Sequence, residues 1–192
     1  MDPAVNAWRK QQRTALLDRR QTLSPDDRQG AADIVAGKLT AIIAAGGIES
    51  VGLYWPIKHE INLLPWAVDL ARQHNLVLCL PVVVTPKAPL EYWRWTQGEP
   101  LARGIWNIPV PAQRDVVRPD LMLAPVVGFD RANYRLGYGG GYFDRTLASL
   151  RQRPMVVGIG YAFSALETIS PQPHDIPMDT VLTDAPNQPE QP

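Results

Sequence analysis

The sequence lacks the residues for a disulfide framework or a membrane span. Cys79 is the one cysteine among 192 residues, so no internal disulfide can form, and its place in an apolar run suggests a strand interior. No apolar run approaches the roughly 20 residues that cross a bilayer, and the first residues lack the apolar core of a signal peptide. We therefore expect a cytoplasmic protein that does not associate with a membrane.

An excess of charge of either sign is also absent. The 19 Lys and Arg residues balance the 19 Asp and Glu residues, so the formal net charge is zero. The overall field that would attract the chain to nucleic acid is missing, and we expect no nucleic-acid partner. The length suits one sizeable core. We expect one domain over residues 1–183, a polar, proline-rich tail over 184–192, and a monomer.

Local patterns predict alternating helices and strands. Helix formers run from about residue 4 to 22, and Ser24-Pro25-Asp26-Asp27 is typical of the start of a second helix, which apolar spacing extends to Gly46. Proline is frequent between Pro81 and Pro125 and predicts loops there. Apolar runs predict further strands and helices: strands at about 51–55, 76–80, 91–95, 120–124, 155–159 and 180–182, and helices at about 63–74 and 142–151.

This alternation predicts an α/β fold. Strands that alternate with helices favour a mainly parallel sheet covered on both faces, which is a three-layer αβα, Rossmann-like architecture. In such a sheet, ligands bind beyond the carboxyl ends of the strands. We therefore expect the functional residues on the loops that follow the strands.

The segment Arg135-Leu136-Gly137-Tyr138-Gly139-Gly140-Gly141 is the most informative one for function. Glycines leave backbone N–H groups unobstructed, and the N-terminus of the helix expected next attracts anions. The segment lacks the Gly-Lys-Ser/Thr ending of a P-loop and the sixth-position glycine of a dinucleotide fingerprint. It predicts a phosphate site outside those two classes, with a plain turn as the alternative.

Single charged residues allow two interpretations each. On a helix, Arg9, Arg13 and Arg20 fall within an arc of about 40°, so they form one basic stripe that either faces solvent or binds an anion. Asp144 either complements the dipole of a helix start or binds a cation. Glu60 follows a strand end and is either a ligand contact or a solvated loop acid.

The chain resembles the 5-formyltetrahydrofolate cyclo-ligases, also called methenyltetrahydrofolate synthetases. The resemblance rests on residues 125–130 running into 135–145, with supporting blocks at 54–60, 106–111 and 174–179. It implies ATP-dependent conversion of 5-formyltetrahydrofolate to 5,10-methenyltetrahydrofolate with release of ADP and phosphate. The implied route transfers the γ-phosphoryl group to the formyl oxygen before ring closure, with Mg²⁺ as cofactor.

The resemblance also implies roles for particular residues. Asp144 and Asp175 correspond to metal ligands, and the folate contacts correspond to Trp55, Glu60, Trp106 and Tyr142. Arg9 stands where the family usually has lysine, and Phe143 where a second tyrosine is common. The ATP contacts correspond to the basic stripe and the glycine segment: Arg9, Lys10, Arg13, Arg135, Leu136, Gly137, Tyr138, Gly139, Gly140, Gly141, Tyr142 and Phe143.

Two other functions stay open at this point. A folate-binding protein without catalytic activity would hold the same substrate but show no dependence on ATP. A sugar-phosphate enzyme of a related fold would keep the glycine segment but would have no need for Glu60 beside Trp55. Folate binding and ATP dependence separate these alternatives.

Overall fold

A computed structural model describes residues 2–185 of the chain. Within this range four α-helices form: α1 (Pro3–Gln21), α2 (Pro25–Ala44), α3 (Leu64–His74) and α4 (Tyr142–Ser149). The predicted start of the second helix is confirmed, because the Ser24 hydroxyl accepts from the Asp27 N–H while the Asp27 carboxylate accepts from the Ser24 N–H. The helix ends before Gly46, whose φ of 96° breaks it.

A seven-stranded sheet forms the centre of the fold. Its strand order is β11-β10-β7-β1-β2-β3-β6. The first five strands are mutually parallel, β3 pairs antiparallel with β2, and β6 pairs antiparallel with β3 at the edge. The predicted mainly parallel sheet is thus confirmed. The strands are β1 (Ser50–Gly52), β2 (Val77–Val82), β3 (Glu91–Arg94), β6 (Val116–Val117), β7 (Leu121–Pro125), β10 (Met155–Ile159) and β11 (Thr180–Leu182).

Several short elements were not predicted. Two small hairpin-like pairs, β4 (Leu101–Arg103) with β5 (Pro109–Pro111) and β8 (Gly128–Phe129) with β9 (Arg135–Leu136), lie outside the main sheet. Two 3₁₀ turns also form: η1 (Ile105–Asn107) connects β4 to β5, and η2 (Ala162–Ser164) follows β10. The proline-rich stretch therefore holds strands where loops were expected. Proline is tolerated in β5 because this strand has a partner on one side only.

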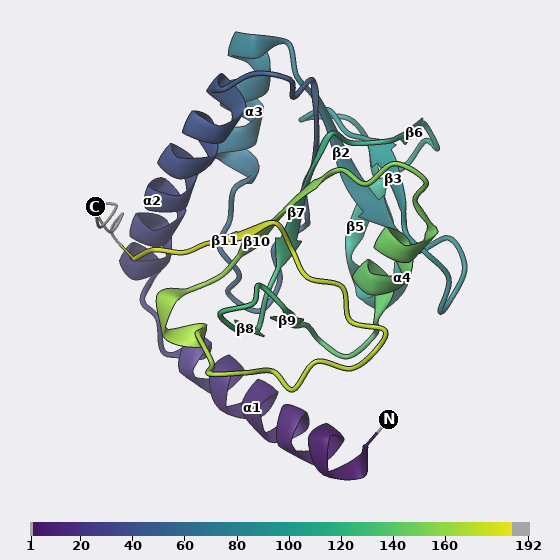
Figure 1. Ribbon diagram of the computed structural model, residues 1–192. Coiled ribbons are helices and arrows are strands. Elements are labelled where there is room, and N and C mark those ends of the chain that lie inside the picture. Colours follow the sequence, from purple (N-terminus) through teal and green to yellow (C-terminus); the bar gives the residue numbers. More distant parts are fainter. Residues whose placement is uncertain (1, 186–192) are drawn as a thin grey trace.

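Helices cover both faces of the sheet, which confirms the three layers (Figure 1). On one face, α2 and α3 pack with residues such as Val35 and Leu39 against sheet residues such as Leu121. On the other face, Leu147 of α4 packs near Met122. Cys79 is fully buried within this second cluster, inside β2, so its predicted place in a strand interior is confirmed, and burial raises the pKa of its thiol to about 12.

Helix α1 lies across the end of the sheet where β8 and β9 also sit (Figure 1). At the other end of the described chain, the Asp184 carboxylate accepts from the Ala162 N–H at 2.6 Å, and Lys38 Nζ donates to the Ala185 carbonyl at 2.6 Å. The first two residues of the predicted tail thus contact the domain, and residues 186–192 lie outside the described range. No helix of residues 2–185 is long and apolar enough to span a bilayer.

Candidate active site

Loops that follow three parallel strands meet at one edge of the sheet. The side chain of Arg20, on α1, donates to the carbonyl of Val126, just after β7, at 2.6 Å. The hydroxyl of Tyr161, just after β10, donates to the carbonyl of His59, in the loop after β1, at 2.9 Å. These contacts gather the carboxyl ends of the strands under α1, which is where open α/β sheets bind ligands.

The loop that carries Glu60 is tightly constrained. Lys58 and His59 have φ values of 46° and 58°, a left-handed conformation that β-carbon sterics disfavour. A turn closes the loop: the Glu60 N–H donates to the Ile57 carbonyl at 2.9 Å, and the Ile57 N–H donates to Glu60 Oε2 at 3.0 Å. The Glu60 carboxylate is therefore held at a fixed position by its own loop.

The Glu60 side chain is buried beside a cation and a hydroxyl. Its Oε1 accepts from the Tyr138 hydroxyl at 3.0 Å and lies 4.0 Å from Arg20 Nη1, and the side chains of Arg20 and Glu60 are only 2% and 4% exposed. Burial raises the pKa of Glu60, while the Ile57 N–H and the Arg20 charge oppose this shift. This burial rules out the alternative of a solvated loop acid.

The glycine segment joins β9 to the start of α4. Gly139 and Gly141 have φ values of 93° and 63°, which glycine adopts without strain. Arg13 Nε donates to the Gly137 carbonyl at 2.6 Å, and a β-carbon on Gly139 would lie 3.7 Å from the Arg13 guanidinium carbon. Arg13 of the basic stripe on α1 therefore packs against the glycine segment.

Two arginine–aspartate pairs flank this segment. Arg135 Nη2 donates to Asp144 Oδ2 at 2.8 Å, and Arg9 Nη2 donates to Asp175 Oδ2 at 2.5 Å. The Ile176 N–H donates to Asp144 Oδ1 at 3.2 Å, so the segment around Asp175 lies beside the start of α4. Burial alone would raise the pKa of Asp175, but hydrogen bonds, led by the one from Arg9, outweigh it and bring the pKa below its ordinary value.

Comparison with known proteins identifies the family. The model of the 5-formyltetrahydrofolate cyclo-ligase family matches residues 5–184. The chain belongs to this family. A 5-formyltetrahydrofolate cyclo-ligase of Mycolicibacterium smegmatis is 30% identical over 91% of this chain and 93% of its own. One of Mycoplasma pneumoniae is 28% identical over 93% of this chain and 98% of its own.

Solved structures of relatives share the fold. The structure of a 5,10-methenyltetrahydrofolate synthetase from Mycoplasma pneumoniae has a TM-score of 0.77 at 25% identity, and the match covers 92% of this chain and 99% of that one. That of Aquifex aeolicus 5,10-methenyltetrahydrofolate synthetase has a TM-score of 0.78 at 29% identity, covering 92% and 89%. The chain is therefore an enzyme of a family that uses ATP and a folate.

The aromatic residues implied for the family's folate site divide into two places. Trp106 packs edge-to-face on Tyr142, with ring centroids 5.6 Å apart, and remains 66% exposed. Trp55 is half-buried and packs edge-to-face against Trp95, with centroids 6.5 Å apart. Trp106 and Tyr142 thus form one surface available to a flat ring. Trp55 packs against the main core, near the start of the loop that runs from β1 to Glu60.

Among the residues implied for the family's ATP site, neighbours on α1 differ in orientation. Arg9 is buried and turned toward Asp175, whereas Lys10 is exposed and makes no ion pair with any residue of 2–185. Leu136 is buried in β9, and the Phe143 ring lies 4.9 Å from the Arg135 guanidinium. Arg9 is therefore the member of the pair that reaches the site.

The sequence interpretation missed two arginines of this site. The resemblance gave Arg20 no role, yet it lies beside Glu60; its place on the stripe with Arg9 and Arg13 was the available signal. Arg145 donates to the Gly140 carbonyl at 2.6 Å and lies 4.8 Å from the Tyr142 ring centroid. Arg145 ends the 135–145 block that carries the family resemblance but was given no role there, because its contact depends on the turn made by the glycines.

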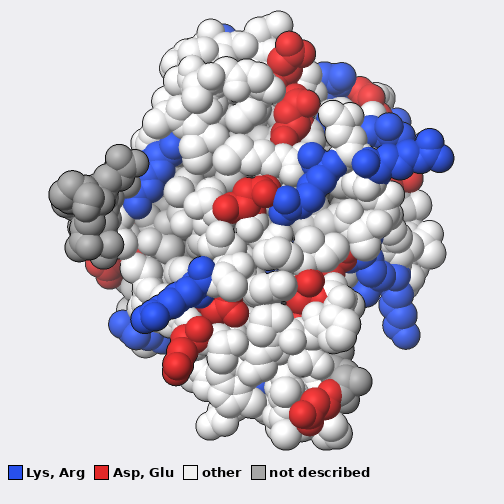
Figure 2. Space-filling view, viewed as in Figure 1, with Lys and Arg blue, Asp and Glu red and all other residues white. Residues whose placement is uncertain are grey.

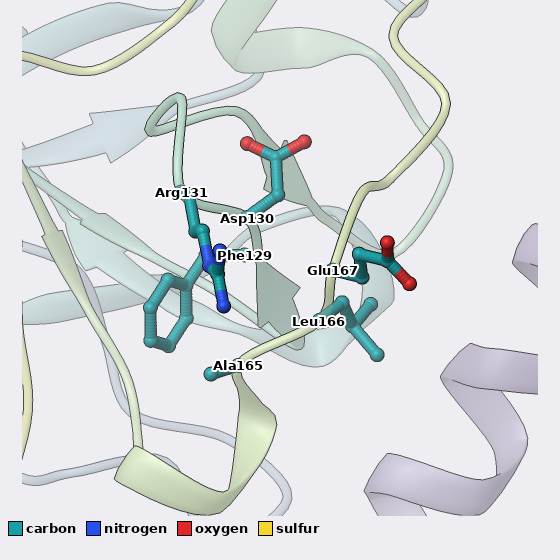
Figure 3. Close-up of a pocket in the computed structure, with 6 residues that line it drawn as sticks. All are labelled: Phe129, Asp130, Arg131, Ala165, Leu166 and Glu167. Carbon is teal, nitrogen blue, oxygen red and sulfur yellow. The ribbon is translucent and has the colours of Figure 1, made fainter.

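A separate hollow of about 410 Å³ lies next to β8 (Figure 3). Arg131 and Glu167 lie on opposite sides of it, and the buried Asp130 lies between them with its carboxylate pointing upward in the view. The Asp130 carboxylate accepts from the backbone N–H groups of Ala132 and Tyr134, each at 3.1 Å. Asp130 thus shapes its own loop. On the molecular face seen in Figure 2, basic and acidic side chains are intermixed.

Proposed function

We propose that the protein closes the ring of 5-formyltetrahydrofolate to give 5,10-methenyltetrahydrofolate, with ATP converted to ADP and phosphate. One observation carries the proposal beyond family membership: Tyr138, in the glycine segment, donates to Glu60 on the folate side. The segment that suits phosphate and the carboxylate that suits folate are thus adjacent, as a phosphoryl transfer between two bound substrates requires.

The proposed chemistry assigns different tasks to the two parts of the site. A formamide oxygen is a poor leaving group, so transfer of the γ-phosphoryl group to it lets a folate nitrogen attack and phosphate depart. Arg13, Arg135 and the glycine N–H groups would hold the phosphates and stabilise the charge that develops on them. Glu60 would accept a hydrogen bond from the pterin or from the attacking nitrogen.

We also propose that Asp144 and Asp175 hold Mg²⁺. No cluster of three or more metal-binding side chains occurs within residues 2–185. Two carboxylates suit Mg²⁺ nonetheless, because this ion is usually bound by one or two carboxylates together with substrate phosphates and water. When bound, it would neutralise charge on the triphosphate. We further propose that the protein is cytoplasmic and that it is a monomer. Sedimentation of the purified protein would test the monomeric state.

The first prediction is that purified protein forms methenyltetrahydrofolate from 5-formyltetrahydrofolate only when ATP and Mg²⁺ are both present. The near-ultraviolet band of the product follows the reaction directly. Well-folded protein that binds folate but makes no product with ATP would instead support the folate-binding alternative. Protein that does not bind folate would support the sugar-phosphate alternative.

The second prediction concerns the metal. Asp144→Asn and Asp175→Asn keep the side-chain shape but remove a charged ligand, so the Mg²⁺ concentration needed for half-maximal activity should rise several-fold, with partial rescue at high Mg²⁺. Asp18→Asn, an exposed change on α1, is the control and should leave the requirement unchanged. Reduced stability without a changed Mg²⁺ requirement would assign Asp144 to the helix start instead.

A further inference from the structure

The Tyr138 hydroxyl is a bridge between two parts of the site. It accepts a hydrogen bond from Arg20 Nη1 at 3.4 Å and donates one to Glu60 Oε1 at 3.0 Å. Burial and the neighbouring Glu60 charge raise the pKa of Tyr138, so the hydroxyl keeps its proton and remains a donor. Tyr138 belongs to the glycine segment, while Glu60 lies 78 residues away on the loop after β1.

The two ends of this bridge differ in how firmly they are held. On the Glu60 side, the Tyr161 and Tyr54 hydroxyls fix the backbone on either side of the glutamate by donating to the carbonyls of His59 and Ile61. On the other side, Tyr138 is 39% exposed and is followed by exposed glycines. The position of the Tyr138 hydroxyl therefore depends on the conformation of the glycine segment.

Arg20 holds the Tyr138 hydroxyl and the Glu60 carboxylate in position. Its side chain is 2% exposed, and Nη2 donates to the Val126 carbonyl at 2.6 Å, which directs Nη1 toward the hydroxyl and the carboxylate. The Lys58 ammonium lies 5.3 Å from the centroid of the Tyr138 ring and adds a cation–π contact from the Glu60 loop. Arg20 thus acts on Glu60 as a fixed charge.

We propose that Tyr138 couples the two substrate sites, with Arg20 as a positioning residue: nucleotide bound to the glycine segment fixes the Tyr138 hydroxyl on Glu60, and folate affinity rises. The inference rests on the proposed function, because it takes the glycine segment as the nucleotide site and Glu60 as a folate contact. The coupling must be reciprocal, so bound folate raises nucleotide affinity by the same factor. A buried carboxylate that loses a donor binds its ligand less well, which gives the coupling its physical cause.

The test compares the folate dissociation constant with and without a non-hydrolysable ATP analogue and Mg²⁺, measured by titration calorimetry. In the unmodified protein the analogue should tighten 5-formyltetrahydrofolate binding by about fivefold or more, the lower range of measured couplings. In Tyr138→Phe, the ratio of the folate dissociation constant without the analogue to that with it should fall to near one, while each ligand still binds. Tyr54→Phe is the matched control, because its hydroxyl supports the same loop at Ile61 without contacting the glycine segment, and it should keep the ratio.

Two outcomes would overturn the coupling: a Tyr138→Phe protein with an unchanged ratio, or an unmodified protein that makes product but shows a ratio of one. An unmodified protein that fails to bind folate or to make product would instead refute the proposed function itself. The two failures are therefore distinguishable.

Arg20 is tested by its effect on pH dependence. Its charge lowers the pKa of Glu60, so in Arg20→Met the pH at which folate affinity declines on acidification should move upward, and Arg20→Lys should restore part of the shift. A purely structural arginine would change affinity without moving this pH, and that result would remove Arg20 from the proposal. Arg20→Lys also supplies the comparison should Arg20→Met not fold.

Discussion

Replacing Arg135 with methionine is expected to weaken ATP binding by about 10- to 150-fold, because each charge-assisted hydrogen bond to phosphate contributes about 1.5–3 kcal/mol. Folate affinity should change little. The substitution also leaves Asp144 without its partner at 2.8 Å, and breaking a buried pair costs about 3–5 kcal/mol of stability. Calorimetric titration with ATP and urea denaturation measure the two effects separately.

Arg13→Met provides the matched comparison. Arg13 is half-buried, and within the described chain its one side-chain hydrogen bond is to the Gly137 carbonyl, so stability should fall much less than in Arg135→Met. Loss of ATP affinity in both variants, with a large stability loss in only one, would separate phosphate binding from folding. Unchanged nucleotide affinity in both would remove these arginines from the site.

Glu60→Gln is expected to disrupt the use of folate and to leave ATP affinity measured without folate nearly unchanged. If the carboxylate contacts the pterin, the folate dissociation constant should rise by about 5- to 150-fold, because the amide places a donor where an acceptor is needed. If it contacts the attacking nitrogen, binding should survive while ring closure slows. Folate titration and single-turnover absorbance distinguish the two. Normal binding and normal turnover would exclude both roles.

The pH dependence of folate binding gives a second measure of the same carboxylate. Burial raises the pKa of Glu60, so on acidification folate affinity should fall at a higher pH than an ordinary glutamate would give. Glu60→Gln does not titrate at this position and should show a flatter profile. A profile identical to that of the unmodified protein would mean that another group controls the dependence.

Features set by neighbouring residues could be predicted from the sequence. The Ser24 cap and the glycine stop of α2 depend on contacts a few residues apart, and the buried strand β7 is visible as a contiguous apolar run; the structure has all three. The strands β4 and β5 could not be predicted, because they are stabilised by pairing with each other rather than by apolar alternation. The first strand also ends at Gly52 instead of continuing to Trp55, since the chain leaves the sheet to reach Glu60.

The candidate site shows the same division. Its glycine segment could be recognised because the residues that form it are contiguous. The Arg20–Tyr138–Glu60 cluster joins three separate segments, so only the fold brings its members together. The pairing of predicted phosphate arginines with predicted metal aspartates was likewise invisible in the sequence, since Arg9 and Asp175 lie 166 residues apart.

These two arginine–aspartate pairs have a consequence for anion selectivity. Arg9 and Arg135 each already have a carboxylate counterion, so these two arginines add little net positive charge to the site, whereas Arg13 makes no ion pair within residues 2–185. Chloride or sulfate arriving alone would have to displace an aspartate and leave it without a cation in a poorly hydrated place. Under the proposed function, a nucleotide that brings its own divalent cation would exchange both partners at once: phosphate would replace carboxylate on the arginines, and the carboxylates would be released toward the metal. The two pairs would then favour the metal–nucleotide complex over simple salts.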